Sequence, residues 1–360
     1  MIQGSGFNLH EASSTVDEQN WNELVLGCPD ATPYHLWEYG TALCSAYNYQ
    51  RHYLVLSDNK AAVGVLPLIL LRSRLFKDRL ISLPFCEYGG PLLRTGIQEG
   101  TVALDCLIRG AKALAGELDA AYIEFRSPPN PTGLSTRLPC APKSRYCTFE
   151  VDLSEGEDAI WRLLPKRTRN AISRGYRNGL VVSAVATERD LDDYFDLYLR
   201  TQKRLGSPPH SLRFFMNLCG MSGNTRFFLA SNDAGPVAGA IMFFDGQKMY
   251  WWNSVADPAF RYLNGTSVIL WSAMKWGAQS GLRGFVLGRT RDGSGVYRFK
   301  QGWGGTRMDY FDYVYSPREK SVRLPDPEQN LYRVASRVWS LLPRALASKL
   351  GPAVISQIGL

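Results

Sequence analysis

The residues best suited to chemistry lie close together near position 300. Aromatic and basic side chains alternate there between glycines, in the order Tyr297, Arg298, Phe299 and Lys300. Because the lysine interrupts any apolar stripe, the segment is a poor candidate for the core, and a solvated helix face is the alternative. A lysine held on a rigid element can stabilise negative charge that develops at an acyl carbon, or it can bind a substrate phosphate. The segment therefore predicts a site for an activated carbonyl.

A second candidate is the start of a long predicted helix. The sequence Asn264-Gly265-Thr266 comes directly before residues 267–279, where apolar residues recur at helical spacing. The free backbone amides at a helix N-terminus attract an anion, and Arg261 just before them can add a charged donor. This arrangement suits the phosphates or the terminal carbonyl of an acyl donor. A plain helix cap is the alternative.

Arg289 is a third candidate, placed after a short predicted strand at residues 284–287. Gly288 permits a sharp turn beside it, and an arginine there can make bidentate contacts with a phosphate or a carboxylate. We expect Arg289 and Arg298 to hold anionic parts of a donor or an acceptor. A surface ion pair is the alternative for Arg289.

A basic stretch at residues 166–177 adds further cations. At helical spacing, Arg167, Arg174 and Arg177 project to one side while Ala171 and Ile172 face inward. Such a face suits an RNA backbone or a nucleotide diphosphate, and a merely solvated helix is the alternative.

Trp252 stands in the sequence Trp-Trp-Asn near the end of a predicted strand. It can contact an acyl or a sugar group, although core packing is the alternative. The four histidines have neither metal-binding nor triad spacing, and no Ser-His-Asp, Cys-His or Walker arrangement is present. We therefore expect no metal, no bound cofactor and no covalent acyl-enzyme.

The elements that must position these residues form two similar sets. Strand-like and helix-like segments alternate through residues 1–145, and the pattern begins again after Cys147. Five prolines mark residues 127–143 as a connector. The pattern predicts two mixed α+β domains, at 1–145 and 146–320. Residues 321–360 are expected to form a helical tail that packs on the first domain.

Composition narrows the class of protein. The chain has 360 residues, 45% of them hydrophobic, and a net charge of +8 with a pI near 9.1, which favours anionic partners. Seven scattered cysteines argue against a disulfide framework or a zinc site. The N-terminus shows no signal peptide, and the longest apolar stretch, 61–71, is too short to span a bilayer. We expect a cytoplasmic protein whose mildly apolar tail, 345–360, can contact a membrane peripherally; its oligomeric state stays open.

The chain resembles the FemAB/FemX group of peptidoglycan-bridge aminoacyltransferases and related FemAB-like proteins of exopolysaccharide loci. The resemblance rests on a Trp- and Ala-rich helix, a strand ending in Gly-Arg-Thr, and a Gly-x-Tyr-Arg-Phe-Lys-x-Gly-Trp-Gly segment. These features are Trp271, Trp276 and Gly281, then residues 288–290, then residues 295–304. The basic stretch resembles the helix that starts the family's second domain. Tyr88 with the following Gly-Gly-Pro, and the helix around Trp37, resemble weaker features.

The resemblance implies two GNAT-like domains with the substrate in the cleft between them. It also implies transfer of an aminoacyl group from aminoacyl-tRNA to an amine of a cell-wall precursor, and more distant relatives use acyl thioesters. The family's Phe-Lys pair, which is associated with catalysis, matches Phe299 and Lys300. A long helical-hairpin insertion found in some members has no counterpart here, because no segment shows sustained heptads.

Three functions fit these observations. The first is direct attack by an acceptor amine on a bound ester, without a covalent enzyme intermediate. The second keeps the fold and takes acyl-CoA or an acyl carrier protein as donor, although residues 261–266 only approximate the phosphate loop that such enzymes use. The third is a non-catalytic module that binds RNA or polysaccharide.

Overall fold

The computed structural model describes residues 6–12, 15–58, 61–97, 99–127, 143–318, 322 and 330–359. It divides into two compact units, each treated by itself below. The first unit comprises residues 1–145, 309–325 and 355–360, and the second comprises residues 146–308 and 326–354. Most of the predicted connector, 128–142, lies outside the described residues.

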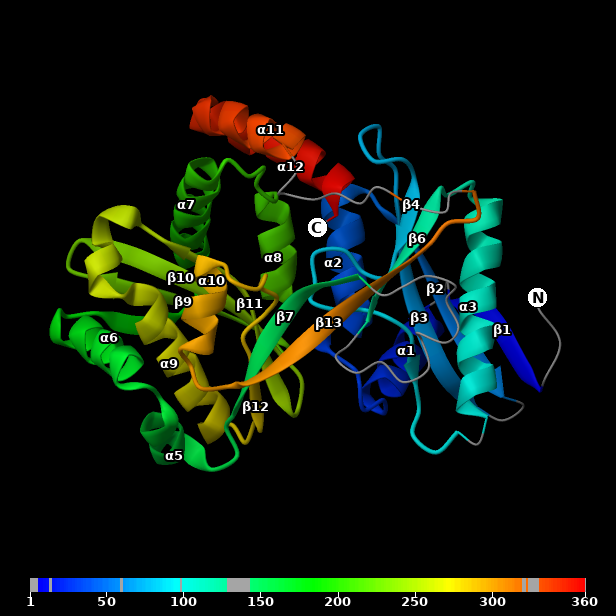
Figure 1. Cartoon of the computed structure of the whole chain (residues 1–360), viewed down its shortest axis with the longest axis horizontal. Helices are drawn as coiled ribbons and strands as arrows, with labels where there is room; N and C mark the ends of the chain where they lie inside the picture. The colour runs from blue at the N-terminus through cyan, green and yellow to red at the C-terminus, as the bar shows by residue number, and fades with distance from the viewer. Residues whose placement is uncertain are drawn as a thin grey trace. The chain divides into compact units, whose positions relative to one another are not determined.

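The first unit is a largely antiparallel sheet with helices on both faces (Figure 1). Its strands follow the order β1-β2-β3-β4-β6-β13, with β5 paired to β3, and only β4 and β6 run parallel. The strands are β1 (Phe7–Ala12), β2 (Gln50–Asp58), β3 (Ala62–Leu71), β4 (Arg79–Ile81), β5 (Leu92–Leu93), β6 (Tyr122–Ser127) and β13 (Thr306–Tyr315). The helices are α1 (Thr15–Leu26), η1 (Pro33–His35), α2 (Trp37–Tyr47) and α3 (Gly100–Glu117).

Side chains of successive strand residues point to opposite faces of this sheet, and apolar residues occupy both faces. Leu54 and Leu56 of β2 join the core beneath α3, whereas Tyr53 points to the other face and stacks on Trp21 of α1, 4.4 Å between ring centroids. Nine of the ten residues of β3 are buried, as expected for a strand covered on both sides.

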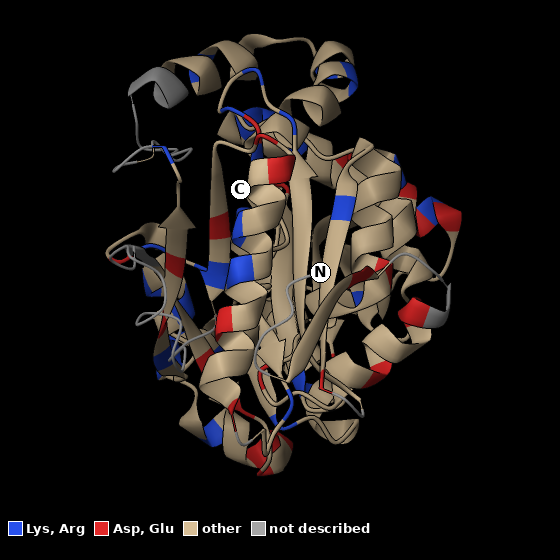
Figure 2. Cartoon of the chain, turned by 90° about the vertical axis from the view of Figure 1, so that its right-hand side faces the viewer, with Lys and Arg blue, Asp and Glu red and all other residues tan. Residues whose placement is uncertain are grey.

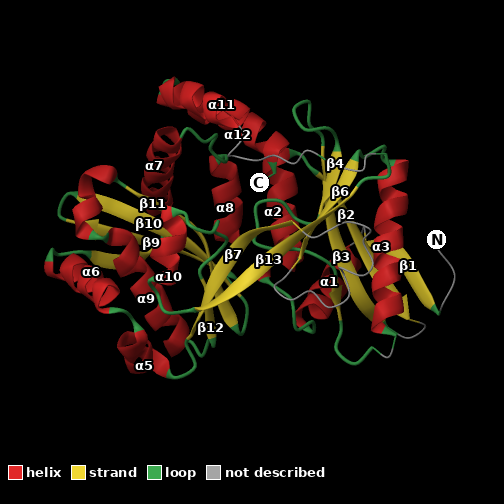
Figure 3. Cartoon of the chain, in the orientation of Figure 1, coloured by secondary structure: helices red, strands yellow, loops and turns green. Residues whose placement is uncertain are grey.

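The second unit has the strand order β7-β12-β11-β10-β9-β8. Figure 3 shows strands in yellow and helices in red. The strands are β7 (Lys143–Asp152), β8 (Val181–Ala184), β9 (Thr225–Asn232), β10 (Gly235–Phe244), β11 (Lys248–Ala256) and β12 (Gly284–Val286). The helices are α5 (Gly156–Leu163), α6 (Lys166–Arg177), α7 (Glu188–Leu205), α8 (Leu212–Gly220), η2 (Pro258–Leu263), α9 (Gly265–Gln279), α10 (Gly295–Gln301), α11 (Asn330–Leu341) and α12 (Arg344–Ile358).

Helices also cover both faces of this second sheet. Phe228 and Ala230 of β9 belong to the core beneath α9, whereas Phe227, next to Phe228 in the strand, packs edge-on against Tyr194 of α7. The strands β11 and β12 run parallel, so the chain must cross over between them, and α9 is that crossover. The helix α6 packs on α9 so closely that a Cβ at Gly175 would lie 2.3 Å from Val268.

The predicted tail, 321–360, does not form a unit of its own. Most of it, residues 326–354, belongs to the second unit, where α11 packs on α7 and Ser336 donates a hydrogen bond to the carbonyl of Leu205 (3.1 Å). Its end, residues 355–360, belongs to the first unit. There the buried guanidinium groups of Arg79 and Arg126 bind main-chain carbonyls of residues 357–359. None of the described helices is long and apolar enough to cross a bilayer.

Candidate functional site

The parallel strands β11 and β12 separate after a short stretch of pairing. Only Lys248, Met249 and Tyr250 of β11 pair with β12. Beyond Val286 the chain leaves β11 and stays paired with the β7 segment. The amide of Leu287 bonds to the carbonyl of Phe149 (2.9 Å), and residue 290 pairs with residue 147. Since β11 continues to Ala256, its edge from Trp251 onward has lost its strand partner on this side, within the described residues. We call this divergence the fork. An unpaired strand edge can bond the backbone-like groups of an extended ligand.

A β-bulge at Trp252 helps β11 to bend away from β12. The pairing with β10 passes from Met242 opposite Trp251 to Ile241 opposite Asn253, so Trp252 is the extra residue. A bulge increases the local twist and redirects the side chains beyond it. The Trp252 ring packs among aromatic rings that include Phe214 and Phe243, at 5.9 and 6.0 Å, and is half-buried there. Trp252 thus packs, which agrees with one of the two interpretations made from the sequence, and its contact with an acyl or a sugar group stays a prediction.

Lys300 lies at the fork. Its Nζ donates hydrogen bonds to the carbonyls of Gly288 and Arg289, both at 2.9 Å, and lies 4.9 Å from the centroid of the Trp251 ring. The side chain is only 5% exposed. The lysine therefore connects the two diverging segments and fixes a positive charge between them. A buried charge needs such partners, because an uncompensated ammonium group in the interior is strongly unfavourable.

The segment of alternating aromatic and basic residues near position 300 packs against the core, although its sequence predicts a poor core segment. The short helix α10 begins at Ser294, whose hydroxyl accepts a hydrogen bond from the amide of Tyr297 (3.0 Å). Tyr297 and Phe299 both pack against the core of the second unit. Our interpretation of this segment as a poor core candidate was wrong, since main-chain carbonyls satisfy the one ammonium group that interrupts it. Arg298, by contrast, is exposed.

Arg289 borders the fork on the β7 side. It is half-buried, and its guanidinium lies 5.2 Å from the ring centroid of Tyr146. Arg291 lies 5.3 Å from the same ring and also donates to the Tyr146 hydroxyl (3.3 Å). Two cations thus share one aromatic ring. Sequence reasoning did not identify Tyr146 or Arg291, and the only signal was their position next to a buried strand and to the Gly-Arg-Thr turn.

The start of α9 lies beyond the far end of β11. Asn264 adopts a left-handed conformation (φ 58°), and its carbonyl accepts from the amides of Ser267 (2.9 Å) and Val268 (3.2 Å). A Cβ at Gly265 would lie 2.7 Å from that of Ala238, so glycine lets the helix start touch β10. Thr266 is half-buried and Arg261 is exposed. Ala256 lies five positions after Trp251 in β11, and it pairs with Ala238, the residue that Gly265 touches. This helix start therefore lies about 17 Å along β11 from the fork.

The basic stretch forms α6, as predicted, and four of its five cations are exposed; the fifth, Arg169, is half-buried and bonds to the carbonyls of residues 161 and 162. Arg167 and Arg174 project from the helix, whereas Ile172 on the opposite side is fully buried. Neither arginine has an ion-pair or hydrogen-bond partner among the described residues. They form an unneutralised basic face together with Lys166 and Arg177.

Two of the predicted site residues belong to the first unit. Trp37 is 4% exposed, packs on Tyr53, and carries the guanidinium of Arg51 above its ring at 3.9 Å. Tyr88 is buried beside Tyr310, 5.8 Å between ring centroids. In this unit both serve packing, and their role towards a substrate stays a prediction.

His210 lies in an aromatic cluster and not in a catalytic triad. Its ring stacks on Tyr198 at 6.3 Å and lies 5.8 Å from Trp252. Burial disfavours the imidazolium form and lowers the pKa of His210 to about 3, so the ring is neutral and a weak base. Across the described part of the chain, no cluster of histidine, cysteine and carboxylate side chains could hold a metal ion.

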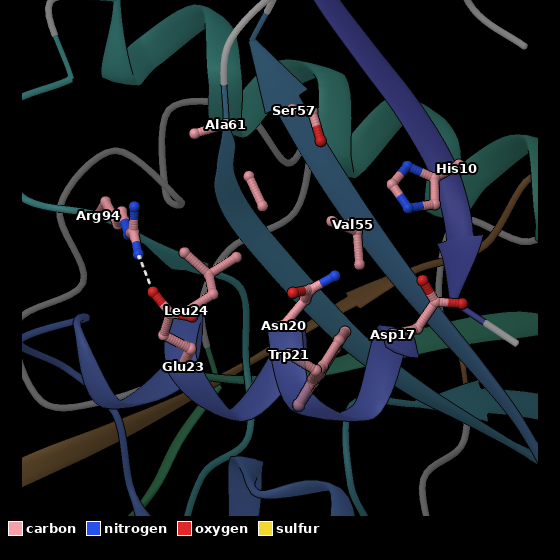
Figure 4. Close-up of a pocket in the computed structure, with 11 residues that line it drawn as sticks. His10, Asp17, Asn20, Trp21, Glu23, Leu24, Val55, Ser57, Ala61 and Arg94 are labelled. Carbon is pink, nitrogen blue, oxygen red and sulfur yellow. Dashed lines mark ion pairs between the residues drawn. The ribbon is translucent and has the colours of Figure 1, made fainter. Parts of the chain in front are cut away.

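Two hollows elsewhere contain no predicted site residue. One of about 330 Å³ lies beside α1 in the first unit, with Trp21 and Leu24 in its lining and His10, Asp17 and an Arg94–Glu23 pair (3.9 Å) around it (Figure 4). Another of about 880 Å³ lies in the second unit beside α5 and the start of β12. Neither contains the fork.

Comparison with known proteins identifies the fold that builds the fork. Residues 165–301 match the family of acetyltransferase (GNAT) domains, and this segment contains β11, α9, β12 and α10. The structure is similar to that of FemX, with a TM-score of 0.66 and 14% identity over 91% of this chain and 100% of that chain. The chain has the GNAT fold, similar to that of FemX. No curated protein matches its sequence significantly.

Two further structures have a similar fold. A tandem GNAT protein from the clavulanic acid biosynthesis pathway has a TM-score of 0.58 and 12% identity, over 88% of this chain and 100% of that chain. L-PGS from Bacillus licheniformis has a TM-score of 0.56 and 11% identity, over 93% of this chain and 96% of that chain. The predicted α+β fold with tandem GNAT-like domains is confirmed, and it is an acyltransferase fold. The expected cleft between the domains stays a prediction.

Proposed function

We propose that this FemX-like chain is an N-acyltransferase in which an acceptor amine attacks an activated carbonyl bound at the fork. The amine nitrogen forms the new C–N bond, the ester or thioester bond of the donor breaks, and the amine proton leaves with the departing oxygen or sulfur through water. The observation that carries the proposal is the fixed ammonium group of Lys300 beside the unpaired edge of β11. A pre-organised positive charge favours the anionic tetrahedral species over the neutral ester.

Each part of the site has a role in this proposal. The unpaired backbone of β11 aligns the donor's chain, and Lys300 keeps its carbonyl partners while its charge acts across the fork. Phe299 holds α10 in place by packing between Trp251 and Trp303, at 6.1 and 6.2 Å. The arginines Arg289, Arg298 and Arg261, and the amides at residues 265–266, bind anionic groups of donor or acceptor.

For the donor we propose aminoacyl-tRNA. The exposed Arg167 and Arg174 of α6 form no ion pair with any residue that the structure describes, and this favours a polyanion such as an RNA backbone. The acceptor in this proposal is an amine of a cell-envelope precursor or a small molecule.

A specific observation favours a second donor, an acyl thioester of CoA or of an acyl carrier protein. The start of α9 lies about 17 Å along β11 from the fork. A donor with a phosphate at one end and a thioester at the other could place its phosphate on the helix start and its carbonyl at Lys300. The third possibility, a non-catalytic binding module, predicts binding without transfer.

A paired binding and transfer experiment separates the three. The melting temperature is measured with charged tRNA, uncharged tRNA, acetyl-CoA and free CoA, and transfer of labelled acyl groups to a panel of amines is measured in parallel. We expect charged tRNA to raise the melting temperature and to support transfer. Transfer from acetyl-CoA alone would establish the second donor. RNA binding with no transfer from any donor would disprove the enzymatic proposal.

A further inference from the structure

The helix α11 exposes an apolar stripe on the side that faces away from the protein. Val334, Val338 and Leu341 recur at helical spacing, and 57%, 58% and 82% of their surfaces are exposed. On the opposite side of the helix, the Ser336 hydroxyl bonds to the carbonyl of Leu205, and Ser336 lies against Gly206, the C-cap residue of α7. The stripe therefore points away from the helix that supports α11.

The helix α12 repeats this arrangement. Leu346 and Leu350 are 42% and 44% exposed and stand one turn apart. Ala347 and Ile355 are buried on the other side, at 4% and 7%. Only Leu342 and Pro343 separate the two helices. The exposed apolar residues of α12 therefore follow closely on those of α11 along residues 334–350.

The charged residues of these two helices are all basic. Residues 330–359 contain no aspartate or glutamate and four cations, namely Arg333, Arg337, Arg344 and Lys349. Figure 2 shows blue and no red on the two helices at the top of the view. Arg344 forms an ion pair with Asp196 of α7, whereas Arg337 and Lys349 are exposed and have no ion-pair partner among the described residues.

We propose that α11 and α12 dock on the surface of an anionic membrane. Helices that lie in a lipid interface combine exposed apolar side chains with basic residues, and the two contributions add. Nucleic acid would use the cations but not the valine and leucine stripe. A second copy of this chain would cover the stripe but would bring unneutralised cations near one another. A lipid surface with anionic head groups satisfies both features at once.

Flotation of the full chain with lipid vesicles tests this proposal. Wild-type protein is mixed with vesicles of phosphatidylcholine, with or without phosphatidylglycerol, and compared with two double variants. Val338→Ser/Leu341→Ser removes apolar contacts, and Arg337→Gln/Lys349→Gln removes charge. Val181→Ser on β8, a valine 68% exposed, and Arg189→Gln on α7 are matched controls elsewhere on the surface.

We expect the wild type to float with the anionic vesicles only, and added salt to weaken the binding. Each neutralised cation should weaken binding about fivefold, and the control variants should bind as the wild type does. Equal binding by all variants would show that general positive charge is responsible and would overturn the proposal. So would failure of the wild type to bind, or a concentration-dependent dimer that Val338→Ser/Leu341→Ser abolishes.

Discussion

The ammonium group of Lys300 lies 4.9 Å from the centre of the Trp251 ring, at the residue where β11 leaves β12. The lysine comes from α10 and the tryptophan from β11, so one contact joins the two sides of the fork. Because the same ammonium group bonds to the carbonyls of residues 288 and 289, its position is determined by three neighbours. A charge held so firmly does not have to reorganise when a transition state forms.

Replacement of Lys300 should therefore reduce turnover strongly. We expect Lys300→Ala to lower kcat by about tenfold to a thousandfold, because the charge that favours the tetrahedral species is lost. Single-turnover transfer with the donor that supports transfer by the wild type measures this effect, and circular dichroism checks the fold. Lys275→Ala on α9 is a matched control, since that lysine forms a half-exposed pair with Glu157. Near-normal turnover of a folded Lys300→Ala protein would remove Lys300 from the mechanism.

The arginines of α6 should contribute to donor affinity but not to stability. We expect Arg167→Gln/Arg174→Gln to weaken tRNA binding and to reduce the slope of log affinity against log salt by about one per arginine. The melting temperature should not change, since both side chains are exposed. Filter binding at several salt concentrations measures the slope, with Arg189→Gln as the control. An unchanged slope would show that α6 is only a solvated helix.

The contact between α6 and α9 should tolerate no added methyl group. In Gly175→Ala the new Cβ would lie 2.3 Å from Val268 and 2.8 Å from the carbonyl oxygen of Leu263. Relief of this overlap should reduce stability by about 1–3 kcal/mol. Thermal melting measures the loss. Gly220→Ala in α8 is the control, because its Cβ meets no atom within 4 Å and should leave the melting temperature nearly unchanged. Equal stability of the two variants would contradict the packing described here.

His35 should make the first unit sensitive to acid. Its Nδ1 accepts from the amide of Thr32 (3.1 Å), its Nε2 bonds to the carbonyl of Gly90 (3.1 Å), and burial lowers the pKa of His35 to about 4. The unfolded chain, with a histidine pKa near 6.5, therefore binds more protons between these two values. The contribution of His35 to stability should be complete above about pH 6.5 and decline towards pH 4, by up to about 3 kcal/mol.

Melting temperatures measured between pH 7 and pH 4 test this dependence. The variant His35→Gln keeps a polar side chain and removes the titration, so its acid slope should be shallower than that of the wild type. An identical slope would assign the acid sensitivity to other groups, such as His210 in the second unit, whose pKa is also lowered by burial.

Arg126 should be essential for the stability of the first unit. Its guanidinium, 4% exposed, bonds to Glu124 (2.9 Å) and to the carbonyl of Gly359 (2.6 Å). Arg126→Met would leave the buried carboxylate of Glu124 unpaired, which should destabilise the unit by about 3–5 kcal/mol.

A double variant separates the lost pair from general damage. Adding Glu124→Gln to Arg126→Met should restore part of the stability, because the unpaired charge is removed. Arg318→Met is the surface control, since its pair with Asp119 is mostly exposed and should contribute less than about 1 kcal/mol. A small effect of Arg126→Met in chemical denaturation would contradict the importance of this buried pair.

The sequence by itself determined the fold class and indicated the segments in which we propose the chemistry. Local patterns carry that information: alternation in β10, the helical spacing of α9, and the Gly-Arg-Thr and Tyr-Arg-Phe-Lys segments are all contiguous in the chain. For the same reason the basic face of α6 was predictable, since its arginines are close in sequence and lie on one helix.

Only the tertiary structure decided what each side chain does. The sequence indicates a solvated or substrate-facing Lys300. In the structure its ammonium group is buried and bonds to carbonyls eleven and twelve residues earlier in the chain. The bulge at Trp252 depends on its register with β10, and the division of residues 321–360 between two units depends on α7, Arg79 and Arg126. Side-chain period reveals which face of an element is buried, but not which distant atoms complete a hydrogen bond, because those partners are set by packing between elements.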